Sequence, residues 1–259
     1  MHVRNNLQYL TMTTPPKLVA HRGYTQHYPE NTLLGLQAAI DAGAEYLEVD
    51  IQLSKDQVPF LFHDRDMERL CGQKGALHDY SASELSGFRA SDPGRFGYKY
   101  VDNPITTLIG LVGLMQRHPR ASVFIELKRS SLEKFGHELM AKKVLSTLES
   151  VQSQCVIISY HIEALAHVRE HYKWPVGAVI DEWQERNNRA IEELNPQYLF
   201  CDLETLPKKG PVKYFASRIA VFECTDPVVA LALHKRGVEF VETFAIGEMH
   251  EQLKIMVGK

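Results

Sequence analysis

The chain has 259 residues, of which 44% are hydrophobic and 24% charged, and its formal net charge at pH 7 is −3. A chain of this length can bury a full hydrophobic core, in one large α/β domain or in two small ones. The near-neutral charge and the lack of a basic stretch give no reason to expect nucleic acid as a partner.

Residues 1–16 come before the first predicted element and are expected to form a loose N-terminal arm, within which Met12 is an alternative start. This segment lacks the apolar core of a signal peptide, and no run in the chain approaches the roughly 18 apolar residues of a membrane span. A cytosolic location is therefore expected. The four cysteines lie far apart without a CxxC pair, so neither disulfides nor zinc is expected.

Short apolar runs alternate with helical stretches from residue 17 onward, which indicates a parallel sheet with crossover helices. The predicted strands are 17–21, 44–53, 121–127, 155–160, 175–180, 197–202, 218–224 and 240–244. The predicted helices are 31–42, 107–118, 132–151, 161–171, 185–194 and 227–236, with a weaker one at 207–216. Eight such units predict a closed (β/α)8 TIM barrel, as one domain over residues 17–259. An open doubly wound sheet is the alternative, but its glycine-rich phosphate loop is missing.

One interval departs from this alternation. After the second strand, the turn at 54–57 is followed by the run VPFLFHD (58–64), which predicts a hairpin return. Residues 65–104 then show only a short helical patch, near 83–85. A long irregular segment after a barrel strand usually covers the active-site mouth, so we interpret it as a small capping insertion.

Two acidic residues stand in the second predicted strand, AEYLEVDIQL (44–53). Because side chains alternate along a strand, Tyr46, Glu48 and Asp50 share one face while Leu47 and Val49 share the other. Adjacent carboxylates repel each other unless a cation lies between them or they share a proton. The pair is therefore a candidate functional site, and a solvated edge strand is the alternative.

A third carboxylate, Glu126, ends the third predicted strand and alternates onto a common face with Lys128. Glu126 is therefore expected to join Glu48 and Asp50 around one centre. Three carboxylates describe a hard oxygen site that suits Mg²⁺ or Ca²⁺. Arg22 at the end of the first strand, together with Lys128, supplies the planar fork and the point charge that a phosphate group needs.

Two histidines complete this set of ionisable groups. His21 ends the first predicted strand, and His63 ends the hairpin return. A protein core would not collect seven ionisable groups at adjacent strand ends without a charged ligand, because unpaired buried charges cost several kcal/mol each.

The segments HRGYTQHYPENT (21–32), LEVDIQLSKDQVPFLFHD (47–64) and FIELK (124–128) resemble the glycerophosphodiester phosphodiesterase family. That family joins the motifs HRG, PENT, ExD, HD and ExK in this order, and the resemblance runs from residue 17 to about 247. It implies hydrolysis of glycerophosphodiesters to glycerol 3-phosphate and a free alcohol. The implied partner is this small substrate, within lipid and glycerol metabolism, and the oligomeric state is left open.

The resemblance also implies a role for each matching residue. It implies Glu48, Asp50 and Glu126 as ligands of one divalent cation, Mg²⁺ or Ca²⁺, His21 and His63 as general acid and base, Arg22 and Lys128 as phosphate contacts, and Glu30 and Asn31 as residues that support the site.

The chemistry of the residues agrees with this reaction. A phosphodiester gains negative charge as it is attacked, so a metal ion with Arg22 and Lys128 would stabilise the transition state more than the ground state. The leaving alcohol needs a proton and the nucleophile must lose one, which suits a pair of histidines. The nucleophile is either water or the glycerol 2-hydroxyl, and we favour the hydroxyl, which would form a cyclic phosphate.

The second half of the chain departs from the family pattern. The family usually carries Trp-Thr-Val-Asn on its seventh strand, where this chain has VFECTDP (221–227), so Phe222 replaces the tryptophan. Glu223 and Glu242 are unexpected acids on barrel strands. Each faces a helix end or solvent, or one of them reaches the mouth. In that second case, Glu223 with Phe222 would select substrates with a polar or cationic head group, such as choline.

Two further functions are weighed beside the leading one. A lysophospholipase D or sphingomyelinase-like enzyme would have to accommodate acyl chains, and no clear amphipathic membrane-binding helix supports it. A non-catalytic barrel used for binding is disfavoured because no core position of the motif is missing.

Overall fold

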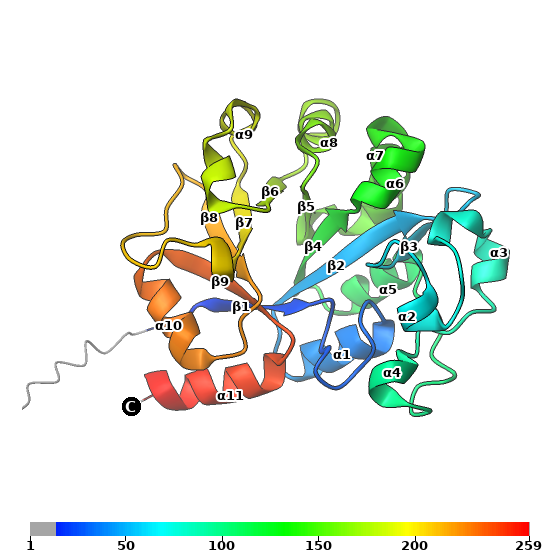
Figure 1. The fold of residues 1–259 in the computed structure, drawn as a ribbon, viewed down its shortest axis with the longest axis horizontal. Coiled ribbons are helices and arrows are strands. Elements are labelled where there is room, and N and C mark those ends of the chain that lie inside the picture. Colours follow the sequence, from blue (N-terminus) through cyan, green and yellow to red (C-terminus); the bar gives the residue numbers. More distant parts are fainter. Residues whose placement is uncertain (1–13, 259) are drawn as a thin grey trace, which may run out of the picture.

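The computed structural model describes residues 14–258, so residues 1–13 of the expected N-terminal arm, Met12 among them, lie outside the described residues. Eight parallel strands form a closed barrel in which β1 pairs with both β2 and β9 (Figure 1). The barrel strands are β1 (Lys17–His21), β2 (Tyr46–Leu53), β4 (Ser122–Leu127), β5 (Cys155–Ser159), β6 (Val176–Ile180), β7 (Tyr198–Asp202), β8 (Arg218–Phe222) and β9 (Val238–Thr243).

The predicted (β/α)8 barrel is therefore confirmed, and each of the eight predicted runs overlaps a barrel strand. The ends differ from the prediction by at most two residues, as in the second run, where the strand begins at Tyr46. The predicted hairpin return is also present, because β3 (Pro59–Leu61) pairs antiparallel with β2.

Helices follow most of the barrel strands and cover the outside of the barrel (Figure 1). They are α1 (Leu33–Asp41), α5 (Leu108–Arg117), α6 (Arg129–Phe135), α7 (His137–Leu148), α8 (Ile162–His167), α9 (Arg189–Leu194), α10 (Pro227–Lys235) and α11 (Ile246–Val257). Short helical turns accompany them as η2 (Glu149–Gln154), η3 (Val168–Tyr172), η4 (Trp183–Asn187) and η5 (Leu203–Thr205). Among the described helices, none has the length and apolar character needed to cross a bilayer.

Three differences separate the observed helices from the predicted ones, and two of them have a physical cause in the sequence. The segment 132–151 divides into α6 and α7 at Gly136, whose φ of +78° no helix continues through. The weak helix at 207–216 was a wrong prediction: this segment holds Pro207, Gly210 and Pro211, and it forms an irregular connection after η5. The helix α11 was missed.

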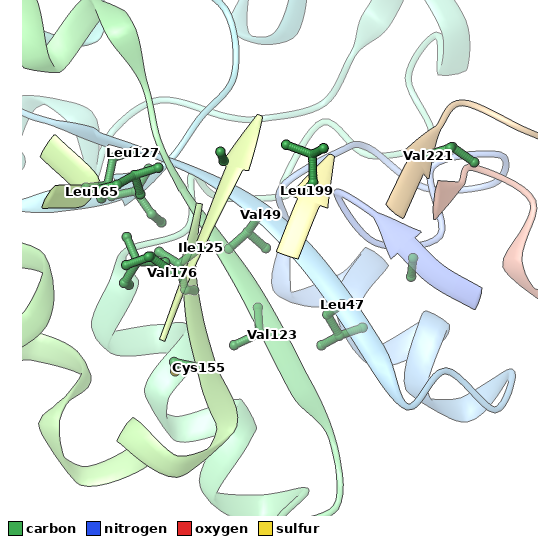
Figure 2. Packing of buried hydrophobic residues seen from close by; sticks show 14 of the residues in the cluster. Leu47, Val49, Val123, Ile125, Leu127, Cys155, Leu165, Val176, Leu199 and Val221 are labelled. Carbon is green, nitrogen blue, oxygen red and sulfur yellow. The ribbon is translucent and has the colours of Figure 1, made fainter. Parts of the chain in front are cut away.

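Hydrophobic side chains lie on both faces of the barrel wall. On the outer face, Leu47 and Val49 of β2 pack near Val123 and Ile125 of β4, in one cluster with residues of the surrounding helices (Figure 2). The alternation predicted for the second strand is therefore confirmed, since Tyr46 packs instead against the inner cluster.

The inner cluster fills the barrel with side chains from all eight strands, with the partly buried Tyr46 as the contribution of β2. Its buried members are Val19, Phe124, Ile158, Val179, Phe200, Ala220 and Phe240. The ring of Phe124 meets Phe200 and Phe240 nearly edge to face, with centroids 5.0 and 5.8 Å apart. Such aromatic pairs contribute about 0.5–1.5 kcal/mol beyond the area that they bury.

The segment between β3 and α5 contains α2 (Glu68–Cys71), η1 (Leu77–Asp79), α3 (Ala82–Leu85) and α4 (Pro93–Phe96). Of these, α3 matches the helical patch expected near 83–85. The segment has its own buried cluster, made of Phe60, Phe62, Met67, Leu70, Leu77, Leu85, Ala90 and Ile105. Such a core holds these short helices in place, although none of them is long enough to be stable alone.

We expect Phe124→Ala to lower the free energy of unfolding by about 3–5 kcal/mol, because it removes a fully buried ring from the inner cluster. Denaturant unfolding followed by circular dichroism measures this change. Phe215→Ala is the matched control, since Phe215 is 76% exposed and should cost far less. Equal losses of the free energy of unfolding in the two variants would contradict the stabilising role given to the inner cluster.

Candidate active site

Three carboxylates meet at the carboxyl ends of β2 and β4. In the parallel register, Asp50 lies opposite Glu126, and Glu48 lies one inward-facing position before Asp50. One oxygen from each residue lies within 4.8 Å of the others, and the three residues are at most 9% exposed. The structure therefore brings together the three acids that the sequence analysis singled out.

Two basic side chains neutralise part of this charge. The Nζ atom of Lys128 lies 3.1 Å from Asp50 Oδ1 and 3.0 Å from Glu126 Oε1. The Nε atom of Arg22 lies 3.2 Å from Asp50 Oδ2, and its backbone N–H donates to Glu48 Oε2 at 3.1 Å. Both cations thus converge on Asp50.

The three carboxylates differ in their electrostatics. Burial opposes ionisation of Asp50, but Lys128 and Arg22 outweigh it and hold the pKa of Asp50 well below its usual value. Burial raises the pKa of Glu48, and the neighbouring charge of Asp50 raises it further. Burial likewise raises the pKa of Glu126. Glu48 and Glu126 would gain most from an additional cation.

The acidic cluster fits a hard divalent cation. All three donors are carboxylate oxygens, which Mg²⁺ and Ca²⁺ prefer. The Oε1 atom of Glu48 is buried and accepts no hydrogen bond from any described residue. A buried acceptor without a partner is costly, and a bound cation would satisfy it. Residues 14–258 therefore include a cluster able to hold one metal ion.

The loop between β1 and α1 is folded tightly beneath these groups. Gly23 has a φ of +94°, and a Cβ atom there would lie 2.9 Å from the backbone carbon of Gly35, so only glycine fits. Asn31, also in a left-handed conformation, donates from Nδ2 to Asp50 Oδ2 at 2.9 Å. Its Oδ1 accepts from the backbone N–H of Asp50 at 3.1 Å. Asn31 therefore fixes the orientation of Asp50.

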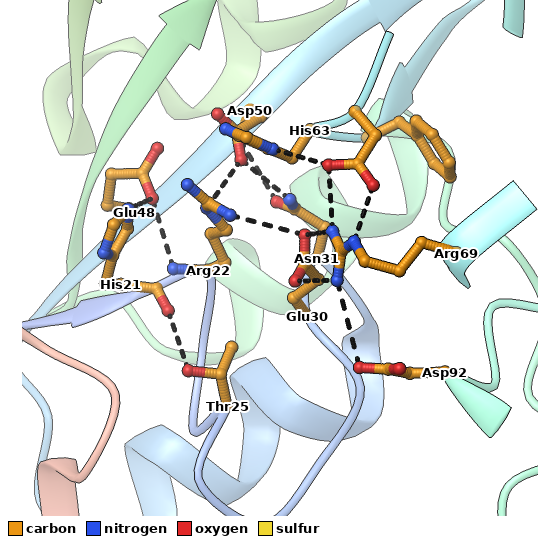
Figure 3. A network of polar contacts seen from close by, with 12 residues as sticks. His21, Arg22, Thr25, Glu30, Asn31, Glu48, Asp50, His63, Arg69 and Asp92 are labelled. Atoms are coloured by element: carbon orange, nitrogen blue, oxygen red, sulfur yellow. Dashed lines mark hydrogen bonds and ion pairs between the residues drawn. The ribbon is translucent and has the colours of Figure 1, made fainter. Parts of the chain in front are cut away.

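Both predicted histidines are held by carboxylates at Nδ1. His21 Nδ1 lies 2.8 Å from Glu223 Oε2, and His63 Nδ1 lies 2.9 Å from Asp64 Oδ1. The Nε2 atom of His21 lies 3.8 Å from Glu48 Oε2, and Figure 3 shows His63 beside Asp50. Each imidazole therefore has its Nε2 atom left to meet a ligand at the acidic cluster.

Of the two unexpected acids, Glu223 lies just after β8 at the barrel mouth, where it contacts His21, and Glu242 lies within β9. Glu223 also accepts a hydrogen bond from the backbone N–H of Phe244 at 2.7 Å, while Glu242 is 2% exposed. Burial raises the pKa of Glu223 to about 8. Burial and the neighbouring Glu223 raise the pKa of Glu242. The ring of Phe222 lies tilted to that of His21, with the centroids 6.4 Å apart.

Two neighbours of the histidines were missed from the sequence. The ring of Phe244 stacks on His21 with centroids 5.0 Å apart and an angle of 11°. Its place at the end of the last predicted strand was a usable signal. Arg69, from α2, contacts Glu30 and Asp64. An arginine in an irregular segment carries no periodicity that could have revealed this contact.

Comparisons of the sequence with known proteins match this chain to one family. Residues 21–240 match the Glycerophosphoryl diester phosphodiesterase family. A glycerophosphodiester phosphodiesterase of Bacillus altitudinis is 31% identical over 150 residues, which are 58% of this chain and 60% of that protein. The matched segment thus spans about three fifths of that relative. The enzyme of that name from Caldanaerobacter subterraneus is 33% identical over 76% of this chain and 83% of its own length.

Solved structures share the fold. A phosphodiesterase of Oleispira antarctica, in complex with the product sn-glycerol-3-phosphate, superposes with a TM-score of 0.79 at 23% identity, covering 93% of this chain and 97% of that one. A structure from Silicibacter pomeroyi, described as a glycerophosphoryl diester phosphodiesterase, gives a TM-score of 0.82 at 17% identity, over 95% of each chain. At these identities the likeness establishes the barrel fold.

Glu223→Gln is expected to change how stability depends on pH. In the folded state the pKa of Glu223 is about 8, against 4.5 for an ordinary glutamate. Ionising Glu223 therefore lowers the free energy of unfolding by about 1.4 kcal/mol for each unit of that difference in pKa. Stability that is present below about pH 4.5 is lost as the pH rises to about 8, and the glutamine variant should lose less of it.

Denaturant unfolding at pH 5, 6.5 and 8, with EDTA to exclude metal binding, measures this effect. Glu193→Gln, at an exposed glutamate, is the control and should follow the wild type. If Glu223→Gln and the wild type lose the same free energy of unfolding across this window, the raised pKa of Glu223 is refuted.

Proposed function

Because the chain belongs to the Glycerophosphoryl diester phosphodiesterase family, we propose that it hydrolyses glycerophosphodiesters to glycerol 3-phosphate and an alcohol. One observation carries this proposal: three carboxylates, two cations and two histidines converge at neighbouring strand ends within the segment that matches the family. The solved relative that contains sn-glycerol-3-phosphate has the same fold and supports the product assigned to this chain.

Arg22 and Lys128 are proposed to bind the phosphate. Each already faces the acidic cluster, at 3.2 and 3.1 Å from Asp50, so a phosphate oxygen beside that cluster would meet both. A divalent cation held by Glu48, Asp50 and Glu126 would withdraw electron density from phosphorus and offset the charge that develops there. The guanidinium and the ammonium add to this stabilisation from either side of Asp50.

His21 and His63 are proposed as the proton-transfer pair. One imidazole takes the proton from the nucleophile, and the other donates a proton to the leaving alcohol as its bond to phosphorus breaks. Holding both rings at Nδ1 orients Nε2 and sets the tautomer. We favour the glycerol 2-hydroxyl as nucleophile: its oxygen bonds to phosphorus, the alcohol leaves, and water then opens the cyclic phosphate.

Several narrower assignments remain proposals. Glu30 and Asn31 support the site, and Phe222 with Glu223 is the candidate for selecting a polar or cationic head group. Residues 65–104 are proposed as a capping insertion within a single barrel domain. The cytosolic location and the role in lipid and glycerol metabolism also stay predictions from the sequence.

An assay of the purified protein tests the reaction. Glycerophosphocholine, glycerophosphoethanolamine, glycerophosphoglycerol and lysophosphatidylcholine are offered with Mg²⁺ or Ca²⁺. Glycerol 3-phosphate released from the three soluble diesters is measured with a coupled dehydrogenase, and choline released from lysophosphatidylcholine, beside lysophosphatidic acid, is measured with choline oxidase. We expect release from at least one of the three soluble diesters. Turnover of lysophosphatidylcholine alone would favour the lysophospholipase D alternative, and inactivity on all four would favour a binding protein.

Glu48→Gln is expected to remove both metal binding and activity without loss of stability. The glutamine is isosteric, but it lacks the charge that a cation needs, so turnover should fall by at least about 100-fold. Since burial raises the pKa of Glu48, the free energy of unfolding measured in EDTA should stay unchanged or rise. Isothermal titration with Mg²⁺ and Ca²⁺ measures binding directly.

Glu45→Gln, at an exposed residue just before β2, serves as the matched control and should bind and turn over like the wild type. EDTA should abolish wild-type activity, and added metal should restore it. Activity that survives complete metal removal would contradict the proposed mechanism.

A further inference from the structure

A second group of possible metal ligands lies beside the acidic cluster. Glu30, His63 and Asp64 each offer an atom within 4.8 Å of the others. The guanidinium of Arg69 already fills the space between the two carboxylates (Figure 3). It donates to Glu30 Oε2 and Oε1 at 2.8 and 2.7 Å, and to Asp64 Oδ2 and Oδ1 at 2.6 and 2.9 Å.

All four carboxylate oxygens therefore have a guanidinium partner. Two paired N–H···O bonds to each acid match the planar fork of arginine, which the ammonium of lysine cannot reproduce. Side chains Glu30 and Asp64 are only 7% and 21% exposed, so water can replace little of this contact. The cation that lies between these two carboxylates is thus the guanidinium of Arg69. A metal ion is not needed to partner their oxygens.

Arg69 comes from the insertion, where its position is firmly held. It lies in α2 next to Leu70, which is 1% exposed and belongs to the insertion's own core. The backbone carbonyl of Leu70 also accepts hydrogen bonds from the N–H groups of Ser91 and Asp92. The guanidinium is therefore anchored to a packed unit rather than to a free loop.

Each acid held by Arg69 touches one residue of the proposed site. Asp64 Oδ1 lies 2.9 Å from His63 Nδ1, and Glu30 Oε1 lies 3.4 Å from Arg22 Nη1. We propose that Arg69 is a positioning residue through which the insertion orients His63 and Arg22 for catalysis. This inference rests on the proposed function and extends it, because it makes the insertion part of the catalytic apparatus as well as a cover.

Removing Arg69 has two physical consequences. Glu30 and Asp64 would be left as close, poorly solvated carboxylates that repel each other, so Asp64 would leave its place at His63 Nδ1. Glu30 would then depend on Arg22 alone and draw that guanidinium away from Asp50. A displacement of about 1 Å in a proton-transfer group or phosphate contact can cost about 100-fold in rate.

Three variants test this role. Arg69→Ala should lower kcat by about 10- to 100-fold with a smaller change in KM, and Arg69→Lys should restore only part of the loss. Arg95→Ala is the matched control: Arg95 also ties the insertion to the β1–α1 loop, by donating to the Thr25 carbonyl at 2.6 Å, and it has no contact with Glu30 or Asp64 among the contacts of the described residues. It should stay within about 2-fold of the wild type.

Guanidinium ion in the millimolar range should rescue Arg69→Ala several-fold, because it can enter the space left by the side chain, and it should leave Arg95→Ala unchanged. Thermal unfolding of each variant checks that it is folded. Equal losses in Arg69→Ala and Arg95→Ala, or an Arg69→Ala variant with wild-type kcat, would overturn the inference.

A measurement independent of turnover uses protein labelled with ¹⁵N-histidine, in which His63→Asn assigns the His63 signals. Long-range ¹H–¹⁵N spectra should show a single tautomer protonated at Nδ1 in the wild type and in Arg95→Ala, and averaging of tautomers in Arg69→Ala. An unchanged His63 tautomer in Arg69→Ala would overturn the inference. If the wild type cleaves no diester, the proposed function fails while this spectrum still decides the role of Arg69.

Discussion

Asp50 is the charge around which the strand ends are arranged. It is 1% exposed, and it is contacted by Arg22 after β1, by Asn31 in the following loop and by Lys128 after β4. A carboxylate this deeply buried stays ionised only if cations and N–H groups surround it. The contacts that keep Asp50 ionised therefore fix the positions of Arg22, Asn31 and Lys128 at the first half of the barrel mouth. The left-handed residues of the loop between β1 and α1 bring Arg22 and Asn31 to this carboxylate.

The other acids fall into two groups with different consequences. Glu30 and Asp64 share Arg69, so all four of their carboxylate oxygens accept a hydrogen bond from one side chain of the protein. Glu48 and Glu242 each have a buried oxygen without a hydrogen-bond partner among the described residues, and burial raises the pKa of both. A cation bound beside Glu48 would give the first of these oxygens a partner.

Sequence patterns predicted the strands and the acidic cluster because both depend on local rules. A period of two places Glu48 and Asp50 on one face, and parallel pairing brings Glu126 level with Asp50. Arg69 could not be found in this way, because its contacts follow from how an irregular insertion folds onto the barrel. The helix expected at 207–216 is absent because the apolar spacing there was a weak signal. The proline and glycine residues in the segment interrupt a helix and outweighed that signal.

The two histidines show how one barrel can build two unlike environments for the same side chain. His21 is the last residue of β1 and stacks on Phe244, and its partner Glu223 accepts one further hydrogen bond among the described residues, from the backbone N–H of Phe244. His63 follows the hairpin, and its partner Asp64 is held on both oxygens by a guanidinium. Burial also lowers the pKa of the His21 imidazole well below its ordinary value, so the proposed proton-transfer pair is built from one imidazole in a buried, stacked position and one tied through Asp64 to the insertion.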